Sequence, residues 1–110
     1  MYLKHCLVTS NVEFFKEPVG DTISSHKTIK QYAYILHDKD PGKSPHWTIY
    51  LNFGSSGVDT KQIGEWFGLQ ESQVERIKGR KTDALQYLTH SNDTQKNKYQ
   101  YPVSEIVANF

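Results

Sequence analysis

Residues 46–53 alternate strictly between apolar and polar side chains. Trp47, Ile49, Leu51 and Phe53 share one side, and His46, Thr48, Tyr50 and Asn52 share the other. Successive side chains of a strand point to opposite faces, so this segment is predicted to be a strand with one face in the core. An apolar and aromatic run precedes it, and the turn-forming residues 40–44 connect the two. The pattern predicts a β-hairpin over residues 31–53.

The remaining segments predict a mixture of strands and helices. A first strand is expected over residues 2–9, where Lys4 and His5 are interpreted as surface groups, and a strand is favoured over a helix for residues 71–78. A turn at residues 18–21 precedes a short helix within residues 22–29. Asp59 is a helix cap and Gly68 a stop signal, so a helix is expected between them. A second clear helix begins at Thr82.

Composition narrows the classes of protein to which the chain can belong. Its 110 residues suit a single domain, and the formal net charge of +1 gives no strong overall attraction to nucleic acid, so any such attraction must come from local patches. The only cysteine, Cys6, excludes an internal disulfide and fits a reducing cytoplasm. No apolar run approaches the roughly 20 residues of a membrane span, and no signal peptide is visible. We therefore expect a soluble, cytoplasmic protein.

Three potential metal ligands lie at the turn end of the predicted hairpin. His37 closes the first strand, His46 opens the second and Asp40 lies in the turn between them. Any one of these side chains alone is more often a hydrogen-bonded surface group. Together, two imidazoles and a carboxylate suit a divalent metal with open coordination positions.

The second predicted helix carries another candidate group. Asp83, Tyr87 and His90 follow one another at helical spacing and share one side. A single tyrosine on a helix is usually half-buried packing. The densest basic run of the chain, residues 78–81, comes just before this helix, and it is either solvated surface or a contact to a phosphate backbone.

Three short segments resemble the replication initiator (Rep) proteins of small rolling-circle plasmids, which belong to the HUH endonucleases. They are His37-Asp38-Lys39-Asp40, Pro45-His46-Trp47-Thr48 and Tyr87-Leu88-Thr89-His90. The resemblance covers about residue 32 to the end, in order and in spacing. It implies an α+β fold with a central antiparallel β-sheet flanked by helices. It also implies His37, Asp40 and His46 as metal ligands and Tyr87 as nucleophile.

Thr48 departs from the family pattern, which has a second histidine at this position. Thr48 points to the same face as His46 and therefore occupies the ligand position. A neutral hydroxyl is a poorer ligand than imidazole, although it can hold a metal-bound water. A hard cation such as Mn²⁺ or Mg²⁺ tolerates that arrangement. The substitution is equally compatible with weakened or lost cleavage.

The reaction that the resemblance implies is a transesterification on single-stranded DNA at a melted or extruded replication origin. Tyr87 attacks a phosphodiester and leaves a 3′-OH and a 5′-phosphotyrosine. Because a phenol has a pKa near 10, only about one in a thousand is ionised at pH 7, so the nucleophile must be activated. His90 is the candidate for proton handling. The candidate DNA contacts are the basic residues and possible stacking tyrosines Lys78, Arg80, Lys81, Tyr50, Tyr99 and Tyr101.

Two other functions fit the same residues. One is a non-catalytic DNA-binding module that lost cleavage through Thr48. The other is a related nuclease such as a relaxase or a single-tyrosine transposase, against which the His-Asp-Lys-Asp segment argues. Residues 1–110 are expected to form one origin-binding and nicking domain. Because members of this family often continue beyond it, the chain is interpreted as a possible N-terminal fragment that oligomerises through absent regions.

Overall fold

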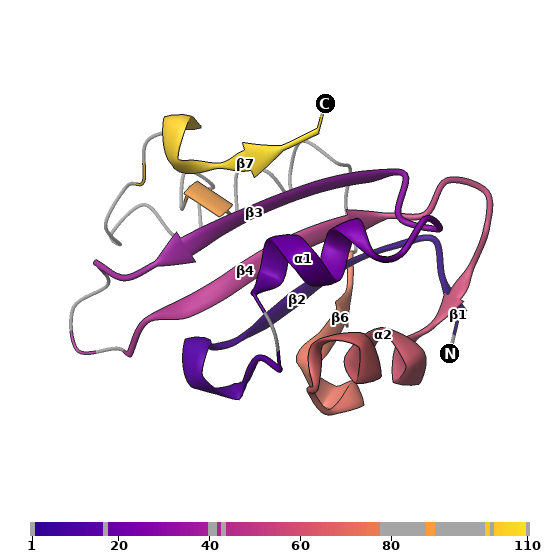
Figure 1. Cartoon of the computed structure of the whole chain (residues 1–110), viewed down its shortest axis with the longest axis horizontal. Coiled ribbons are helices and arrows are strands. Elements are labelled where there is room, and N and C mark those ends of the chain that lie inside the picture. The colour runs from indigo at the N-terminus through magenta and orange to yellow at the C-terminus, as the bar shows by residue number, and fades with distance from the viewer. Residues whose placement is uncertain are drawn as a thin grey trace.

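A five-stranded antiparallel sheet organises the structure (Figure 1). The computed structural model describes residues 2–16, 18–39, 42, 44–77, 88–89, 101 and 103–109. The strands, in their order across the sheet, are β6 (Val74–Arg76), β2 (His5–Asn11), β4 (His46–Asn52), β3 (Gln31–His37) and β7 (Val107–Ala108). With helices packed against this sheet, the predicted α+β class is confirmed.

The predicted hairpin is the centre of the sheet. β3 and β4 pair along their whole length, from Gln31 opposite Asn52 to His37 opposite His46. The alternation in β4 explains this register, because Ile49 and Leu51 then lie in one buried cluster together with Cys6 and other residues of the sheet. The pairing leaves the last residue of β3 and the first residue of β4 side by side.

The predicted first strand is divided in the structure. β1 (Tyr2–Leu3) leaves the main sheet and pairs with β5 (Val58–Asp59), and β2 begins only at His5 and continues to Asn11. The division falls at Lys4, whose carbonyl oxygen accepts a hydrogen bond of 2.8 Å from the backbone N–H of Phe53. The predicted strand at residues 71–78 is likewise shorter, because a 3₁₀ turn, η2 (Glu71–Gln73), precedes β6.

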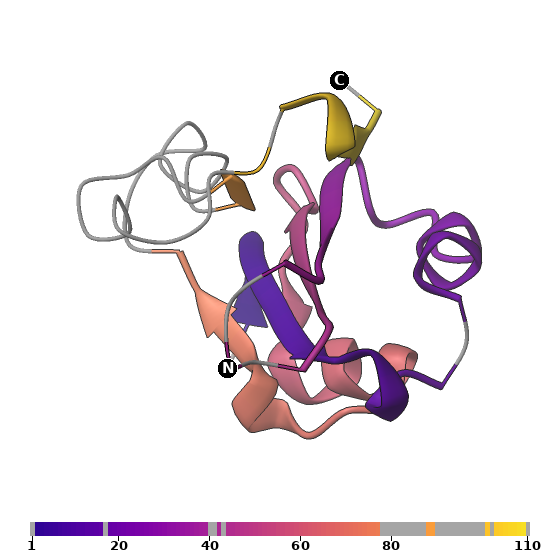
Figure 2. The ribbon, with the colours of Figure 1, turned by 90° about the vertical axis from the view of Figure 1, so that its left-hand side faces the viewer.

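Two helices cover one face of the sheet, α1 (Val19–Ser24) and α2 (Thr60–Phe67), as Figure 2 shows. α2 confirms the prediction. Its cap residue Asp59 accepts a hydrogen bond from the backbone N–H of Lys61, and Gly68 ends the helix with φ 73°. The turn expected at residues 18–21 is wrong, because helix α1 already begins at Val19. No helix in the described part of the chain is long and apolar enough to cross a membrane.

The opposite face of the sheet carries a second buried cluster. Its members are Leu7, Ala33, Ile35, Tyr50, Ile77, Leu88 and Tyr101. Leu88 is one of the two residues of the second predicted helix that the structure describes, and Tyr101 precedes the 3₁₀ turn η4 (Val103–Glu105) and strand β7. Segments from the C-terminal part of the chain therefore pack on the face that carries the two histidines.

Candidate functional site

His37 and His46 face each other at the end of the hairpin. The side-chain nitrogens Nδ1 of His37 and Nε2 of His46 lie 3.2 Å apart. Their ring centroids are 5.0 Å apart, with the ring planes at 66°. His37 is 1% exposed, so its ring lies inside the protein. The register of β3 and β4 creates this pair, because each histidine is the strand residue nearest the turn.

The other nitrogen of each ring is bonded to a backbone carbonyl. Nε2 of His37 lies 2.6 Å from the carbonyl oxygen of Leu88, and Nδ1 of His46 lies 3.0 Å from that of Ser44. A carbonyl oxygen only accepts, so both of these nitrogens must carry the proton. In the neutral rings, the two nitrogens that face each other therefore both bear lone pairs.

Two converging lone pairs need a cation between them. Histidines that bind a metal usually donate their other N–H to a carbonyl or a carboxylate, which fixes the tautomer as it is fixed here. With metal–nitrogen bonds of about 2.1 Å and an angle of 90–110° between them, the two nitrogens would be about 3.0–3.4 Å apart. The observed 3.2 Å fits that range. A single shared proton, forming an N–H···N hydrogen bond, is the simpler occupant.

Thr48 adds an oxygen to the same place. Its hydroxyl Oγ1 lies 3.0 Å from Nδ1 of His37, and the residue is 1% exposed. As the sequence predicted, Thr48 points to the same face as His46. Its hydroxyl can donate to the lone pair of His37, or accept when that nitrogen is protonated.

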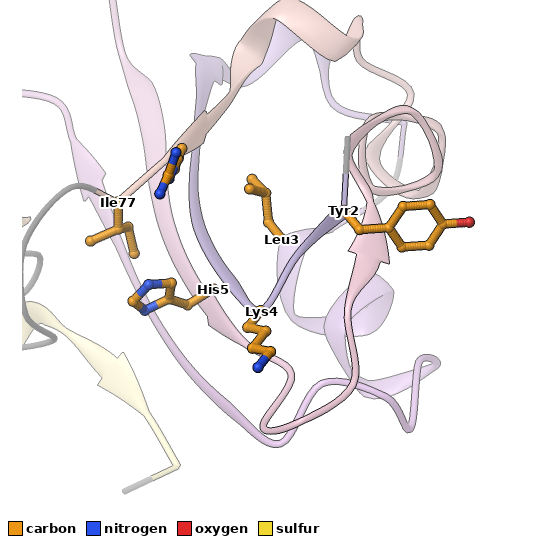
Figure 3. A pocket seen from close by; sticks show the side chains of 6 residues that line it. Tyr2, Leu3, Lys4, His5 and Ile77 are labelled. Atoms are coloured by element: carbon orange, nitrogen blue, oxygen red, sulfur yellow. The ribbon is translucent and has the colours of Figure 1, made fainter.

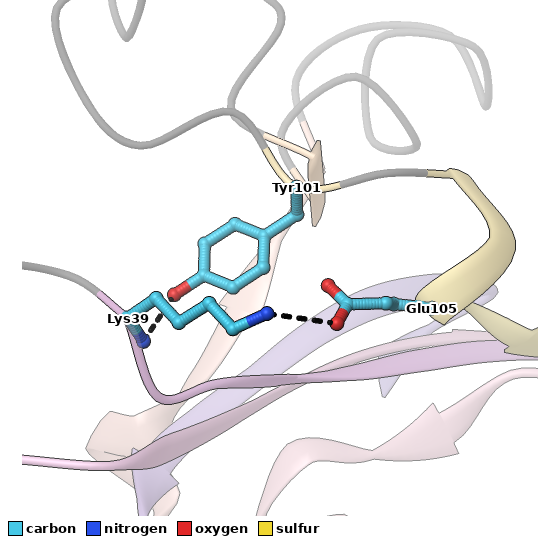
Figure 4. Close-up of polar contacts among 3 residues, drawn as sticks. All are labelled: Lys39, Tyr101 and Glu105. Carbon is cyan, nitrogen blue, oxygen red and sulfur yellow. Dashed lines mark hydrogen bonds and ion pairs between the residues drawn. The ribbon is translucent and has the colours of Figure 1, made fainter.

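Tyr101, which the sequence suggested only as a possible base-stacking residue, lies buried beside His37 instead. Its ring centroid lies 4.6 Å from that of His37, and the residue is 3% exposed. Its hydroxyl accepts a hydrogen bond of 2.9 Å from the backbone N–H of Lys39 (Figure 4). The Lys39 ammonium in turn lies 3.3 Å from the carboxylate of Glu105. These contacts fix the chain where it leaves β3, one residue before Asp40.

Tyr50 does not have the exposed ring that was expected of a DNA contact. It is 0% exposed, and its hydroxyl accepts a hydrogen bond of 3.0 Å from the side-chain amide of Asn52. The ring belongs to the buried cluster on this face of the sheet. The interpretation of Tyr50 as a base-stacking platform is therefore wrong, because the strand alternation predicted its face but not the chain that covers it.

Seven predicted site residues lie outside the described part of the chain. They are Asp40, Lys78, Arg80, Lys81, Tyr87, His90 and Tyr99. Among the residues that the structure describes, no group of three or more His, Cys, Asp or Glu side chains is placed to hold a metal ion. The third ligand, the nucleophile and the basic run therefore stay predictions, and the pair of histidines is the part of the site with a known geometry.

Comparisons with known proteins agree with the resemblance to plasmid replication proteins. Residues 16–110 match the family described as plasmid replication protein, origin binding domain. The chain is also 41% identical, over 128 aligned residues, to a replication protein of Onion yellows phytoplasma (strain OY-M). That alignment covers 100% of this chain and 33% of the relative, so the chain spans about a third of the relative's length.

Proposed function

Because the chain belongs to the family of plasmid replication protein origin-binding domains, we propose that it also nicks and rejoins one DNA strand at a rolling-circle origin. The family accounts for binding of DNA at a replication origin. The chemistry is our proposal, and it assigns the histidine pair to a divalent metal and Tyr87 to the attack on the phosphate.

The observation that carries this proposal is the pair of facing nitrogens of His37 and His46. Two facing nitrogens 3.2 Å apart have the spacing that two ligands of one metal ion need. Here both rings have their other nitrogens fixed by carbonyl oxygens, which is the arrangement of metal-binding histidines. Asp40 lies three residues after His37 in the sequence, and we assign it as the third ligand.

The proposed step exchanges one phosphate ester for another. The phenolic oxygen of Tyr87 forms a bond to phosphorus while the bond from phosphorus to the 3′ oxygen breaks. His90 takes the phenolic proton, and the departing 3′ oxygen gains a proton and becomes a 3′-OH. When bound, Mn²⁺ or Mg²⁺ supplies charge neutralisation at the phosphate. Joining is the reverse reaction, in which a 3′-OH attacks the phosphotyrosine.

The hydrogen bond between His37 and Leu88 supports the assignment of Tyr87. Leu88 follows Tyr87 directly in the chain, and its carbonyl accepts from Nε2 of His37 at 2.6 Å. Leu88 is 0% exposed and belongs to the buried cluster over this face of the sheet. A proposed metal ligand is therefore bonded to the residue next to the proposed nucleophile.

A second candidate function is a DNA-binding module without cleavage. Thr48 favours it, because its hydroxyl lies 3.0 Å from the nitrogen of His37 that would bind the metal. A hydrogen bond from this hydroxyl occupies the lone pair that the metal needs. In that case the Thr48 hydroxyl donates to Nδ1 of His37, and no metal is held between the two rings.

The test is the formation of a covalent protein–DNA adduct. Labelled single-stranded and hairpin oligonucleotides that tile the origin region of the replicon are incubated with the protein and Mn²⁺, and adducts are separated on a denaturing gel. We expect an adduct in the parent, and none in Tyr87→Phe or in the presence of EDTA. Tyr32→Phe, which removes a phenol from the opposite face of the sheet, is the matched control and should still react.

Metal binding is measured separately by titration with Mn²⁺. His37→Ala and His46→Ala should each weaken binding at least tenfold, as loss of a ligand does. An inert parent that gains adduct formation through Thr48→His would establish the second candidate. A parent that is inert together with Thr48→His, and that binds no Mn²⁺, would refute the proposed chemistry altogether.

A further inference from the structure

A pocket lined by three basic residues lies at the other end of the central strands. Its volume is about 430 Å³, and it forms where β1 turns into β2 beside β6 (Figure 3). The lining residues are Tyr2, Leu3, Lys4, His5, Arg76 and Ile77. In Figure 3 the ring of His5 lies beside Ile77, whereas the ring of Tyr2 points away from the other side chains. The basic groups come from the bend at Lys4, from β2 and from β6.

These basic side chains are not committed to other contacts. Lys4, His5 and Arg76 form no ion pair or side-chain hydrogen bond with any residue that the structure describes. Lys4 and Arg76 are exposed and His5 is half-buried. A basic group that serves only fold stability is usually paired with an acid or spread over open surface. Arg76 pairs opposite Cys6, so its side chain lies on the other face of the sheet from that of His5, and Lys4 and Arg76 are the basic groups that this site offers to an anion.

Three acids lie near this pocket. Glu71 lines a neighbouring pocket together with Leu3 and Arg76, and its carboxylate accepts a hydrogen bond from the hydroxyl of Thr60. Glu75 pairs opposite Leu7, so its side chain lies on the face of His5 and not on that of Arg76. Asp59 pairs opposite Tyr2 and accepts a hydrogen bond from the backbone N–H of Lys61. None of the three acids is among the lining residues. The charged residues that line the pocket itself are therefore all basic.

We propose that this pocket binds a phosphate of the DNA backbone, away from the site of cleavage. The inference rests on the DNA-binding side of the proposed function and not on its chemistry. His5 pairs opposite Asn52, six residues along β4 from His46, which is a distance of about 20 Å along the strand. At 3.4 Å per stacked nucleotide, this corresponds to about six nucleotides. The basic run at residues 78–81 follows Ile77 directly in the sequence.

The salt dependence of DNA binding measures such a contact. Each phosphate that a basic side chain neutralises adds about 0.7 to the slope of log K against log salt for single strands, and about 0.9 for a duplex. Lys4→Gln and Arg76→Gln should each lower this slope by about that amount. The double variant should lower it by about twice as much.

The experiment uses fluorescence anisotropy with thymidine oligonucleotides of about four and about 16 nucleotides, and with a duplex of the longer length. EDTA is present throughout, so that no cleavage occurs. Lys16→Gln is the matched control. It removes the same charge from an exposed position at the C-terminal end of α2, where the backbone N–H of Lys16 donates to Phe67. Thermal unfolding confirms that each variant is folded.

We expect the parent to bind the longer oligonucleotide more tightly than the short one, because only the longer one reaches from the pocket to the histidine pair. The Lys4→Gln and Arg76→Gln double variant should lose most of that gain, and Lys16→Gln should keep it. A slope that changes with the duplex and stays unchanged with the single strand would assign the pocket to duplex DNA.

Three results would overturn the inference. They are unchanged slopes in the Lys4 and Arg76 variants, an equal fall in slope for Lys16→Gln, and a parent that binds neither oligonucleotide. Cleavage does not enter the measurement. Reduced slopes in a protein that never forms an adduct would therefore support the phosphate site and reject the nicking chemistry. Unchanged slopes in a protein that does form an adduct would reject the phosphate site and support the nicking chemistry.

Discussion

Removing one oxygen atom, by Tyr101→Phe, tests whether the C-terminal segment holds the histidine site in place. The hydroxyl of Tyr101 accepts a hydrogen bond of 2.9 Å from the backbone N–H of Lys39. Phenylalanine keeps the ring against His37 but leaves this N–H without its acceptor. An intramolecular hydrogen bond contributes about 0.5–1.5 kcal/mol, and an unsatisfied buried donor costs about 1–3 kcal/mol. The hydrogen bond is only part-buried, so the expected loss is about 1 kcal/mol.

The loss is measured by urea denaturation and by thermal unfolding. For a domain of this size, about 1 kcal/mol lowers the Tm by about 4 °C. Glu105→Gln is the matched control, because it breaks the 3.3 Å ion pair with Lys39. The side chain of Lys39 is 47% exposed and that of Glu105 is 38% exposed. An exposed ion pair contributes at most about 1 kcal/mol and is weakened by salt. High salt should therefore abolish the effect of Glu105→Gln and leave that of Tyr101→Phe unchanged.

Titration with Mn²⁺ separates a positioning role from a merely structural one. Lys39 precedes Asp40, the proposed third ligand, so a looser chain at Lys39 should weaken Mn²⁺ binding even where the protein is fully folded. A Tyr101→Phe variant that is as stable as the parent would refute the reasoning from the hydrogen bond. A variant that loses stability but binds Mn²⁺ as the parent does would refute the positioning role alone.

Three further predictions concern the fold. Gly64→Ala should destabilise the protein, because the added Cβ would lie 2.9 Å from a backbone carbonyl oxygen. This clash should outweigh the preference of about 1 kcal/mol that alanine has over glycine in a helix. Urea denaturation checks this, with Gln62→Ala as a control that should leave stability unchanged. Burial raises the pKa of the Cys6 thiol to about 12, so at pH 8 it should react with iodoacetamide only at the rate of unfolding, as mass spectrometry would show. The hydrogen bond from the backbone N–H of Lys61 lowers the pKa of Asp59 below its ordinary value of 3.8. The ionised carboxylate therefore stabilises the fold fully above pH 3.8, and this stabilisation is lost as the pH falls through the pKa of Asp59 in the folded protein. In urea denaturation, Asp59→Asn, whose amide accepts the same bond, should lack this acid-dependent loss.

The parts of the fold that were predicted correctly depend on contacts between close neighbours in the chain. The hairpin follows from alternation in residues 46–53 and from the turn residues before them. Helix α2 follows from Asp59 at one end and Gly68 at the other. Each of these rules acts within a few residues, and the sequence contains all the partners that matter.

The surroundings of the site could not be predicted, because they depend on contacts between distant residues. The hydrogen bond between Lys39 and Tyr101 joins residues 62 positions apart, and that between His37 and Leu88 joins residues 51 positions apart. Nothing in the local sequence of Tyr101 distinguishes a buried ring over a histidine from an exposed ring that stacks on a base. The same difficulty explains Tyr50. Its position in the alternating strand predicted the face of the sheet on which its ring lies, but not that Leu88 and Tyr101 bury this face.

The position of Thr48 decides how strongly a cation can bind between the histidines. Nδ1 of His37 has one lone pair in the neutral ring, and the Thr48 hydroxyl and Nε2 of His46 lie 3.0 Å and 3.2 Å from it. A cation that binds there must compete with the hydroxyl, which has to turn its proton away. Losing that hydrogen bond costs about 0.5–1.5 kcal/mol, or about a twofold to tenfold weaker affinity. A histidine in place of Thr48 would instead contribute a ligand. Under the proposed function, the threonine would therefore weaken metal binding in two ways, by the ligand it lacks and by the hydrogen bond it makes.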